Sequence, residues 1–527
     1  MSTSFDVIII GSGFGGAITA RRLAERGMKV LVLERGRRWY PPMYPRKPTD
    51  PWVYSHRSPE RHNGWLDMRF FKHMTVAQAA GVGGGSLTYS MVALEANPDV
   101  FTRGWPAELT YGELKPYYDT VAREMDLQVV PDGQLTSRFK IAREAAHNLG
   151  YDSRFSKASL AASFSDEWNY DLPDAFDPKH SKPFVNAHGE RQGTCIHLGN
   201  CDIGCDVRAK NSLDVNYIPR AEKAGADVRP LHLVRFIEPT NGKYRVVYDR
   251  IADGKLLRGE EIAPRVIVAA GSLGTTELLL RCRNEFRTLP ALSSLVGTHW
   301  SPNANFLSMA RYGSDRGRVR QSVGVSISSV LDFTDGSFKN QRFVIEDDGF
   351  PNVVLNVLKA YLDNQLVSSV ASGLLDQLER HLREHYALSD LMIWLGAGMD
   401  AADGRFELKS HGLRTQHLDM DLEWDPDASR GVLDAIAEMQ KNLTDATGGT
   451  FTILPTWSLL KSLVTLHPLG GCKMGDSPDN GVVDHLGQVF GYPNLIVADG
   501  AIVPTSTGRN PSHTIAAVAE RIAAHIE

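Results

Sequence analysis

Three of the five cysteines in the 527-residue chain lie close together, at Cys195, Cys201 and Cys205. Three thiolates at this spacing could hold an iron–sulfur cluster that lacks one iron. With His197, which lies among them, the same residues could instead form a tetrahedral zinc site. A third interpretation is that the thiols are buried packing residues. The spacing alone leaves these three interpretations open.

A glycine-rich segment near the N-terminus, GSGFGG, has the spacing of a dinucleotide-binding turn. Gly11 permits a tight turn, Gly13 lets the backbone approach a pyrophosphate, and Gly16 lets a helix pack closely on a strand. Glu34 follows about 20 residues later, at the end of the next apolar run. A carboxylate there accepts hydrogen bonds from ribose hydroxyls and repels a 2′-phosphate. The segment therefore predicts binding of FAD or NAD rather than NADP.

The segments around this turn have the pattern of a βαβ unit. The run FDVIIIG is continuously apolar, as in a parallel strand covered on both faces, and KVLVLERG is a second such run. Between them, AITARRLAERG places apolar residues on one helical face and ends at Gly27. The strand, glycine turn and helix pattern returns at 267–280, and GVGGGS at 81–86 could lie flat against a ring system. These elements predict a doubly wound α/β domain.

The amino-acid composition indicates which kinds of molecule the protein can bind. Charged residues make up 23% of the chain and the formal net charge is −5, so no basic face for nucleic acid is expected. No run approaches the roughly 18 apolar residues of a membrane helix, and the N-terminus does not resemble a signal peptide. We therefore expect a cytoplasmic protein with a small-molecule substrate, no nucleic-acid partner and no membrane span. The length predicts two domains.

Two C-terminal segments complete a set of motifs: TLHPLGGCKMG at 465–475, and DG at 499–500 followed by GRNPSHT. With the N-terminal turn, GVGGGSL, AAGSLGTTELLLR and VGTHWSPNAN, they make the chain resemble the glucose-methanol-choline (GMC) flavoprotein oxidoreductases, in particular the cholesterol oxidase-like branch. The resemblance covers nearly the whole chain and is weakest from about 320 to 460. It implies FAD as the cofactor and an alcohol as the substrate.

The resemblance also implies a domain arrangement. A discontinuous, Rossmann-type FAD-binding domain is expected from residues 1–100, 191–300 and 465–527. An inserted α+β substrate domain, built on an antiparallel sheet, is expected from residues 101–190 and 301–464.

Three shorter segments carry local predictions. VSSVASGLLDQLERHLREH, at 367–385, predicts a helix of the substrate domain. GAGMDAADG, at 396–404, predicts a hairpin in the substrate sheet. Residues 40–75 are rich in Pro, Trp and Tyr and predict a surface excursion.

For the chemistry, the resemblance assigns His467 and Asn510 as the catalytic pair. Hydride moves from the alcohol carbon to flavin N5 while His467, as a base, takes the hydroxyl proton. Asn510 donates a hydrogen bond to the substrate oxygen. Glu346 loosely matches a glutamate of the cholesterol oxidases, although a solvated acidic loop is an alternative interpretation. His513 is interpreted as structural.

FAD is expected to be non-covalently bound, because no histidine follows GGGS in the window where some relatives attach the flavin. The predicted cofactor-binding residues are Gly11, Gly13, Phe14, Gly16, Glu34, Gly83, Gly84, Gly85, Ser86, Val234, Gly271, Asp499, Gly500, Asn510 and Pro511.

The cysteine triplet resembles the one that holds a [3Fe–4S] cluster in GMC sugar dehydrogenases. Leu198 stands where related sequences carry a further cysteine, so four-cysteine ligation is excluded. A cluster would pass electrons to a protein or quinone acceptor, whereas its absence would leave oxygen or a diffusible dye as the oxidant.

The function predicted from the sequence is FAD-dependent oxidation of an alcohol, by an oxidase or a dehydrogenase. The expected substrate is an apolar ring alcohol such as a steroid. Two alternatives remain: an iron–sulfur GMC dehydrogenase with an electron-acceptor protein, and a non-redox lyase that retains FAD.

Overall fold

The computed structural model describes residues 4–313, 319–351, 390–410, 418–454, 457 and 461–527. The helix predicted over 367–385 lies outside these residues.

A five-stranded parallel sheet forms one part of the molecule, with the strand order β21–β12–β1–β2–β8. All residues of β1 and β2 are buried, as their unbroken apolar sequences predict. The strands span Val7–Ile10 (β1), Val30–Leu33 (β2), Asp227–Arg229 (β8), Arg265–Val268 (β12) and Leu495–Val497 (β21). Since β12 and β2 flank β1 on opposite sides, the strand order reverses next to β1, where α/β folds bind their ligands.

Four helices accompany this sheet. They span Phe14–Glu25 (α1), Tyr217–Lys223 (α4), Gly271–Leu280 (α5) and Ser512–His525 (α10). Helix α1 packs against both α10 and α4. The predicted unit of strand, glycine turn, helix and strand at the N-terminus is therefore confirmed.

A three-stranded antiparallel ribbon precedes β12 in the chain. It contains β9 (His232–Thr240), β10 (Lys243–Ala252) and β11 (Lys255–Ala263). Asp253 and Gly254 join the last two strands with φ values of 49° and 70°, which is the backbone of the predicted Asp-Gly hairpin turn.

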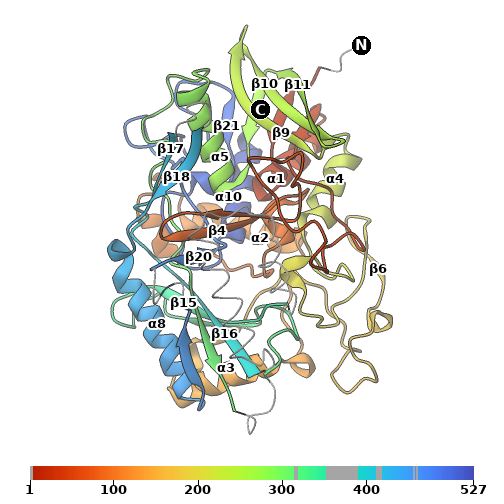
Figure 1. Ribbon diagram of the computed structural model, residues 1–527, viewed down its shortest axis with the longest axis vertical. Coiled ribbons are helices and arrows are strands. Elements are labelled where there is room, and N and C mark those ends of the chain that lie inside the picture. The colour runs from red at the N-terminus through yellow and green to blue at the C-terminus, as the bar shows by residue number, and fades with distance from the viewer. Residues whose placement is uncertain (1–3, 314–318, 352–389, 411–417, 455–456, 458–460) are drawn as a thin grey trace.

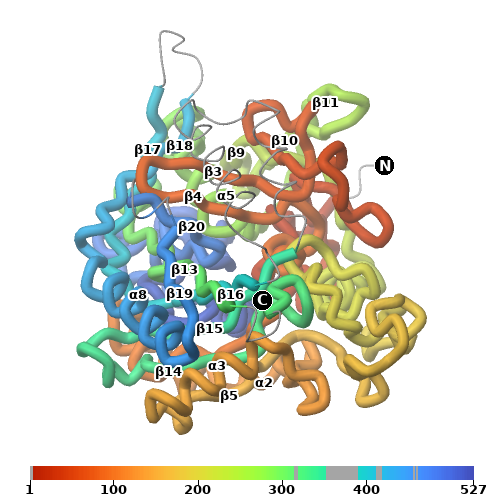
Figure 2. The backbone as a smooth tube through the Cα atoms, turned by 60° about the horizontal axis from the view of Figure 1, so that its bottom comes forward, coloured from red at the N-terminus to blue at the C-terminus, as the bar shows by residue number. Residues whose placement is uncertain are grey.

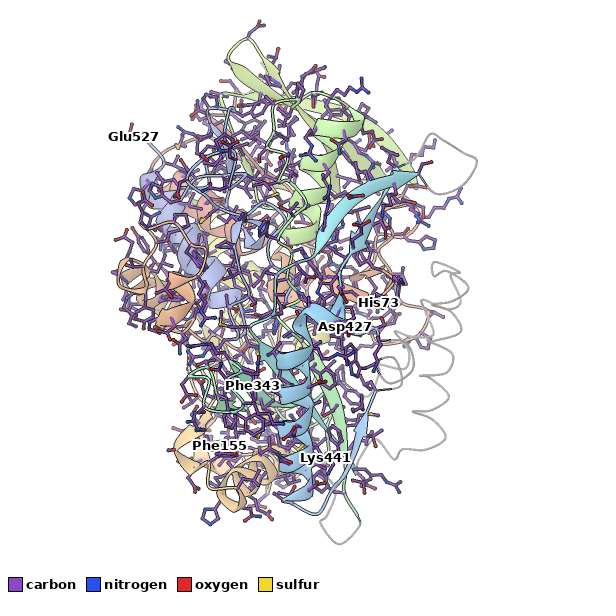
Figure 3. The ribbon with its side chains drawn as sticks, turned by 90° about the vertical axis from the view of Figure 1, so that its left-hand side faces the viewer. His73, Phe155, Phe343, Asp427, Lys441 and Glu527 are labelled. Carbon is purple, nitrogen blue, oxygen red and sulfur yellow. The ribbon has the colours of Figure 1, made fainter. Side chains whose placement is uncertain are left out.

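A six-stranded antiparallel sheet forms the other part of the molecule, in the order β19–β13–β16–β15–β14–β5. Helix α8 (Arg430–Asp445) packs along it, as Figure 3 shows between Asp427 and Lys441. The strands span Phe155–Lys157 (β5), Phe306–Arg311 (β13), Ser329–Asp332 (β14), Phe343–Asp348 (β15), Leu391–Gly398 (β16) and Thr450–Ile453 (β19). Helices α2 (Tyr111–Glu124) and α3 (Ser137–Asn148) complete the larger helices of the described chain.

Three small sheets connect these parts. They contain β3 (Leu66–Phe70), β4 (Met74–Ala79) and β20 (Leu463–Thr465), β17 (Arg405–Ser410) and β18 (Leu418–Glu423), and β6 (Phe184–Val185) and β7 (Arg191–Gln192). Figure 1 shows the β9–β11 ribbon at the top and the six-stranded sheet with α8 at the bottom. In Figure 1 and Figure 2 the sheet of β4 and β20 lies between the two parts.

Two local predictions were wrong. The segment 396–404 does not form a hairpin of the substrate sheet, because the strand that follows it, β17, pairs with β18 and not with β16. The segment 40–75 is not a surface excursion: Trp52, Tyr54 and Trp65 are buried in it, and it contributes β3. These three aromatic side chains therefore pack in the interior.

The fold class agrees with the prediction of a Rossmann-type sheet joined to an antiparallel substrate sheet. The strands of each sheet come from the segments predicted for its domain. The domain boundaries themselves stay a prediction. Among the described helices, none is long and apolar enough to cross a membrane.

Candidate functional site

The carboxyl ends of four parallel strands meet at one edge of the five-stranded sheet, beside a cavity of about 830 Å³. The residues that follow these strands line the cavity: Gly11 after β1, Glu34 after β2, Ala269 after β12 and Asp499 near the end of β21. This is the position at which open α/β sheets bind ligands.

Two glycine loops pack backbone to backbone at the start of α1. Gly11 has a φ of +95°, and a Cβ atom there would lie 2.4 Å from the carbonyl oxygen of Ala269. Gly84, with a φ of +53°, comes from the 81–86 loop, and its Cβ would lie 2.5 Å from the Cα of Gly13. Only glycines allow both approaches, so the two loops form one wall of backbone along the cavity.

The next two glycines fix α1 on the sheet. A Cβ at Gly16 would lie 2.0 Å from the carbonyl oxygen of Gly11, which confirms the close helix–strand contact predicted for it. A Cβ at Gly15 would lie 1.8 Å from the carbonyl oxygen of Ala498. The sequence analysis missed this contact, although the doubled glycine in GSGFGG was a signal for it.

Glu34 is held by three hydrogen bonds from the chain. Its Oε2 accepts from the backbone N–H of Ser12 at 3.1 Å and from the Ser12 hydroxyl at 2.7 Å, and its Oε1 accepts from the N–H of Gly36 at 2.8 Å. The carboxylate is 5% exposed and lines the cavity. Because a carboxylate offers about four acceptor positions, it can still accept a hydrogen bond from a ribose hydroxyl.

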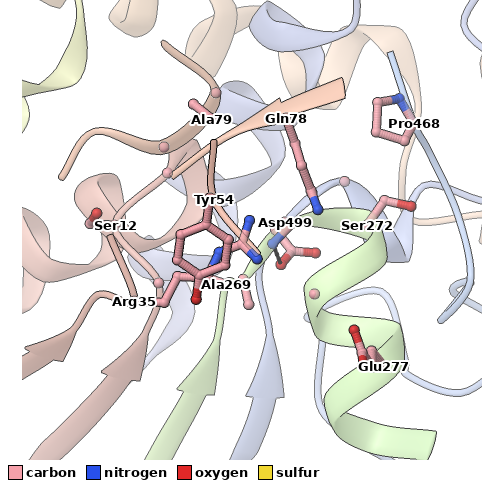
Figure 4. A pocket seen from close by; sticks show the side chains of 18 of the residues that line it. Ser12, Arg35, Tyr54, Gln78, Ala79, Ala269, Ser272, Glu277, Pro468 and Asp499 are labelled. Atoms are coloured by element: carbon pink, nitrogen blue, oxygen red, sulfur yellow. Dashed lines mark hydrogen bonds between the residues drawn. The ribbon is translucent and has the colours of Figure 1, made fainter. Parts of the chain in front are cut away.

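Asp499 joins the end of β21 to the start of α5. Its Oδ2 accepts from the N–H of Gly271 at 2.8 Å and from the Thr275 hydroxyl at 2.5 Å, and its Oδ1 accepts from the N–H of Ala501 at 2.8 Å. Figure 4 shows this carboxylate in the pocket close to Ala269. Burial raises the pKa of Asp499. The three donors compensate for that burial.

His467 lies at the cavity wall and is held by Asn305, a residue that the sequence analysis missed. The Nδ2 of Asn305 is 2.9 Å from Nδ1 of His467. The orientation of the Asn305 amide is fixed on both sides, because its Oδ1 accepts from the N–H of Leu466 at 3.3 Å and its Nδ2 donates to the carbonyl of Gly396 at 3.5 Å. Nδ2 can only donate. The neutral imidazole therefore carries its proton on Nε2.

Burial lowers the pKa of His467 to about 4, so the ring is neutral at ordinary pH. A neutral ring with its proton on Nε2 is a hydrogen-bond donor at that atom. The predicted role of His467 as the proton acceptor requires the opposite tautomer, with a proton on Nδ1 facing the Nδ2–H group of Asn305. The observed hydrogen bonds disfavour that tautomer.

Asn510 lines the same cavity and contacts Glu346. Its Nδ2 donates to Oε2 of Glu346 at 3.2 Å, while its Oδ1 is buried and has no hydrogen-bond partner among the described residues. Glu346 is fully buried within β15, so the alternative interpretation of a solvated acidic loop is wrong. Burial raises the pKa of Glu346 to about 8. This carboxyl lies behind Asn510 and does not itself line the cavity.

The cavity wall contains most of the predicted site residues. Those that line it are Gly11, Gly13, Phe14, Glu34, Gly84, Gly85, Val234, Gly271, His467, Asp499, Gly500, Asn510 and Pro511. Gly16, Gly83, Ser86 and Glu346 lie behind it. Ser86 supports the second glycine loop, because its hydroxyl donates to the carbonyl of Gly83 at 2.7 Å. The two ends of the chain thus contribute to one site.

The three cysteines do not form the predicted metal site. In the described part of the chain, which includes Cys195, Cys201 and Cys205, no group of three His, Cys, Asp or Glu side chains is arranged to hold a metal ion. Burial raises the pKa of all three thiols. His197 is directed to Gln134, 3.0 Å from its Nε2. The arrangement of the described residues therefore supports neither the zinc site nor the iron–sulfur cluster.

His513 has the structural role predicted for it. Its Nε2 lies 2.9 Å from the carbonyl oxygen of Tyr118, and its ring packs edge to face on the Tyr118 ring with centroids 4.8 Å apart. The side chain is 3% exposed.

Tyr54 and Arg35 form a further part of the cavity wall that the sequence analysis missed. The guanidinium of Arg35 lies 4.5 Å above the Tyr54 ring and pairs with Asp67 at 2.7 Å. Figure 4 shows the two side chains against each other in the pocket. The hydroxyl of Tyr54 is buried without a hydrogen-bond partner among the described residues. The hydroxyl is closed to the cavity, so Tyr54 presents its ring to the cavity and not its hydroxyl.

These features fit a dinucleotide that carries a flavin. The backbone wall of glycines and the first turn of α1 suit a diphosphate. The Glu34 carboxylate suits ribose hydroxyls. His467 and Asn510 add polar groups at a second part of the same cavity.

Comparisons with known protein families give two matches. Residues 400–519 match the family model described as GMC oxidoreductase. Residues 6–39 match the model described as FAD dependent oxidoreductase.

Among curated proteins, the chain is 30% identical to a cholesterol oxidase from Acinetobacter baumannii, covering 99% of this chain and 94% of that protein. It is 29% identical to a cholesterol oxidase from Mycobacterium tuberculosis, covering 99% and 91%. It is also 24% identical to the fructose dehydrogenase large subunit of Gluconobacter japonicus, covering 99% and 97%.

Among solved structures, pyridoxine 4-oxidase from Mesorbium loti has the same fold, with a TM-score of 0.61, 16% identity, and coverage of 99% of both chains. A fungal aryl-alcohol oxidase aligns with a TM-score of 0.56 and 15% identity, covering 99% of both chains.

Proposed function

The chain belongs to the GMC oxidoreductase family of FAD-dependent enzymes that oxidise alcohols, and on this premise we propose that its substrate is an apolar ring alcohol such as a steroid. The relatives named cholesterol oxidase support a ring substrate. Apolar side chains share the cavity with His467 and Asn510, among them Val92, Ile327 and Leu395. They offer an apolar ring a surface of matching character.

FAD, when bound, supplies the acceptor for the hydride that leaves the alcohol carbon. We propose that the backbone N–H of Gly13, at the start of α1, holds its diphosphate and that Glu34 holds its ribose, without a covalent bond to the protein. The N–H groups of Gly11 and Gly84 donate to the carbonyls of Leu33 and Gly81, both at 2.8 Å, so these two glycines shape the wall. Val234, Asp499 and Gly500 supply further contacts.

In this proposal His467 orients the substrate. Its Nε2–H donates a hydrogen bond to the alcohol oxygen, because Asn305 occupies Nδ1. Asn510 completes the orientation, since the second N–H of its Nδ2, beside the one that contacts Glu346, can donate to the alcohol oxygen as predicted from the sequence. The observation that carries the proposed function is that these two polar groups share one cavity with the glycine wall. Together they present the C–H bond in a single orientation.

Glu346 is the proposed acceptor of the hydroxyl proton. It is in contact with Asn510, and its Oε1 has no hydrogen-bond partner in the described chain. A carboxyl whose pKa is raised to about 8 by burial exchanges protons in the neutral to mildly alkaline range. With FAD bound as the hydride acceptor, removal of the hydroxyl proton would leave a carbonyl product. Because Glu346 lies behind Asn510, that proton would reach the carboxylate through one intervening water.

Anaerobic addition of alcohols to the purified protein tests the proposal. A ring alcohol should bleach the flavin absorbance without oxygen. His467→Ala should keep FAD and lose at least 100-fold in the rate of bleaching, whereas His525→Ala, at the exposed end of α10, should match the wild type. Undiminished bleaching in His467→Ala would refute the assigned role.

The same experiment separates the alternatives. Flavin that stays oxidised with every alcohol, alongside cleavage of a cyanohydrin, would replace the proposal by the non-redox lyase. Iron and acid-labile sulfide in the purified protein would favour the cluster-bearing dehydrogenase and an electron-acceptor protein, although the arrangement of the three thiols does not support it.

A further inference from the structure

Strand β11 forms one edge of the β9–β11 ribbon. Among the described strands it pairs only with β10, and no backbone hydrogen bond joins its outer side to another described segment. Figure 1 shows the β10–β11 end of the ribbon projecting from the top of the molecule. The outer side of an edge strand presents a row of N–H and C=O groups with which a further strand can pair. This edge can therefore bind another extended chain.

The turn before β11 determines which of its residues face outward. Asp253 and Gly254 form the two-residue turn, and Ala252 and Lys255 lie opposite each other as its closing pair. In such a hairpin the residues of the closing pair exchange hydrogen bonds, and so do those of every second pair after it. The odd-numbered residues of β11 therefore direct their N–H and C=O groups to β10. The even-numbered residues, from 256 to 262, direct theirs outward.

Apolar side chains are exposed along this edge. Leu256 is 37% exposed, Leu257 is 43% exposed and Ile262 is 44% exposed. Edge strands that are protected against pairing carry charged residues or proline at such positions. Three exposed apolar side chains beside unpaired backbone groups instead favour contact with a partner.

The charges between these apolar residues are arranged symmetrically about Gly259. Arg258 precedes the glycine and Glu260 follows it, with side chains that are 59% and 54% exposed. If a second β11 lies antiparallel to the first with the two copies of Gly259 opposite each other, Arg258 faces Glu260 and Leu256 faces Ile262 on both sides of the axis. These four are also the residues whose backbone groups point outward. A shift of the axis by one residue would place Arg258 opposite Arg258, or Glu260 opposite Glu260, so the charges select one register.

We propose that two copies of the chain associate through β11, which joins the ribbons of both copies into one antiparallel sheet. The contact is symmetric, as in most homodimers. It contains two Arg258–Glu260 pairs and two Leu256–Ile262 pairs, together with the backbone hydrogen bonds of the outward residues. A second copy is the partner because the segment 256–262 is complementary to itself. In reversed order it pairs each outward charge with the opposite charge and each outward apolar residue with another.

Contacts within each copy leave the charged groups accessible. Arg258 donates through Nε to Asp249 at 2.7 Å, which leaves its two terminal nitrogens for the second copy. Glu260 accepts at Oε2 from Nη1 of Arg245 at 3.1 Å, and its Oε1 has no partner in the described chain. In the dimer the charges alternate across the contact, from Asp249 and Arg258 of one copy to Glu260 and Arg245 of the other. Each of these groups then lies beside opposite charge only.

The oligomeric state of the purified full chain tests this proposal. Sedimentation velocity measures the mass of the protein at concentrations between about 1 and about 100 µM. We expect a monomer–dimer equilibrium, in which the mass rises toward twice that of the chain as the concentration increases. A monomer at every concentration would overturn the proposal. Growth beyond two copies would also overturn it, because pairing of this one edge is complete in a dimer.

Two charge reversals locate the contact. Arg258→Glu brings two carboxylates together across the axis and Glu260→Arg brings two guanidinium groups together, so each variant alone should dimerise with a dissociation constant at least tenfold higher. An equimolar mixture of the two variants should recover the dimer, because each chain of a mixed dimer meets the opposite charge. Circular dichroism shows whether each variant is folded. Arg430→Glu in α8, where the side chain is 63% exposed, is the control and should dimerise like the wild type.

Ile262→Pro tests the backbone pairing separately from the charges. The proline removes an outward N–H, which an edge strand tolerates because this group takes no part in the pairing with β10. The folded variant should dimerise at least tenfold more weakly than the wild type. If this variant or the single charge reversals dimerise like the wild type, or if the folded mixture stays monomeric, the copies do not meet at β11 and the proposal is overturned. None of these measurements depends on the proposed alcohol oxidation.

Discussion

The side-chain N–H of Asn305 donates to Nδ1 of His467 over 2.9 Å, across 162 positions of sequence. The amide cannot be reversed without opposing the N–H of Leu466 and the carbonyl of Gly396. This one contact decides that the neutral imidazole presents a proton, and not a lone pair, at Nε2.

Replacing Asn305 by Asp tests that relationship. The carboxylate can still accept from Leu466 but would now attract a proton to Nδ1, which leaves a lone pair on Nε2. We expect Asn305→Asp to lower the rate of flavin reduction at least 10-fold with FAD retained. Equal or faster reduction would instead support His467 as the base. Asn305→Leu removes the contact without changing the charge. Its rate of flavin reduction should lie between those of the wild type and Asn305→Asp.

The rate of flavin reduction should rise with pH through about 8. Glu346 must be ionised to accept a proton, and burial raises its pKa to about 8, so the active fraction falls about tenfold per pH unit below that value. Protonation of His467 does not interfere in this range, because burial lowers its pKa to about 4.

Glu346→Gln is the matched variant for this pH dependence. Glutamine can still accept the hydrogen bond of Asn510 but cannot take a proton. Its rate should be at least 100-fold lower and independent of pH between about 6 and 9. A variant that keeps the wild-type pH profile would show that another group takes the proton.

Tyr54→Ala should weaken the binding of FAD to the apoprotein. The change removes a buried ring that lines the cavity, so a lost contact with the dinucleotide is the expected effect. We expect about a tenfold rise in the dissociation constant, equivalent to ~1.4 kcal/mol, in a titration of apoprotein followed by flavin fluorescence. Tyr40→Ala, in the same segment but 51% exposed, is the control and should leave the affinity unchanged. Equal affinities for both variants would contradict a contact of Tyr54 with FAD.

Gly15→Ala should destabilise the protein and reduce its FAD content. The added Cβ would lie 1.8 Å from the carbonyl oxygen of Ala498, so α1 must move away from the end of β21. Overpacking of this kind costs about 1–3 kcal/mol. Gly112→Ala in α2 is the control, because its nearest atom lies 3.9 Å away and alanine favours a helix. Denaturant unfolding and flavin absorbance measure the two effects, and an unchanged midpoint in Gly15→Ala would show that the helix adapts without strain.

The sequence was sufficient wherever a function depends on neighbouring residues. Gly11, Gly13 and Gly16 act within one turn, and Glu34 follows at the end of the adjacent strand, so spacing and residue type predict their arrangement. The same local logic predicted the Asp-Gly turn of the β10–β11 hairpin.

Predictions from local patterns were wrong where the structure of a segment depends on the distant residues that it contacts. The run at 396–404 has the composition of a hairpin, yet β17 pairs with β18 because a strand takes the edge that the rest of the fold offers. The cysteine triplet has the spacing of a ligand set, but packing directs His197 to Gln134 and leaves the three cysteines partly buried.

What the amino-acid sequence alone determined is the glycine turn that opens α1 and the two kinds of sheet, and it supplied His467 and Asn510 as the predicted catalytic pair. What only the tertiary structure decided is how that pair is used: Asn305 sets the tautomer of His467, and Glu346 lies behind Asn510. These contacts join residues more than a hundred positions apart, and no local propensity or spacing encodes which distant side chains meet. Chain folding brings them together, and burial then sets their protonation.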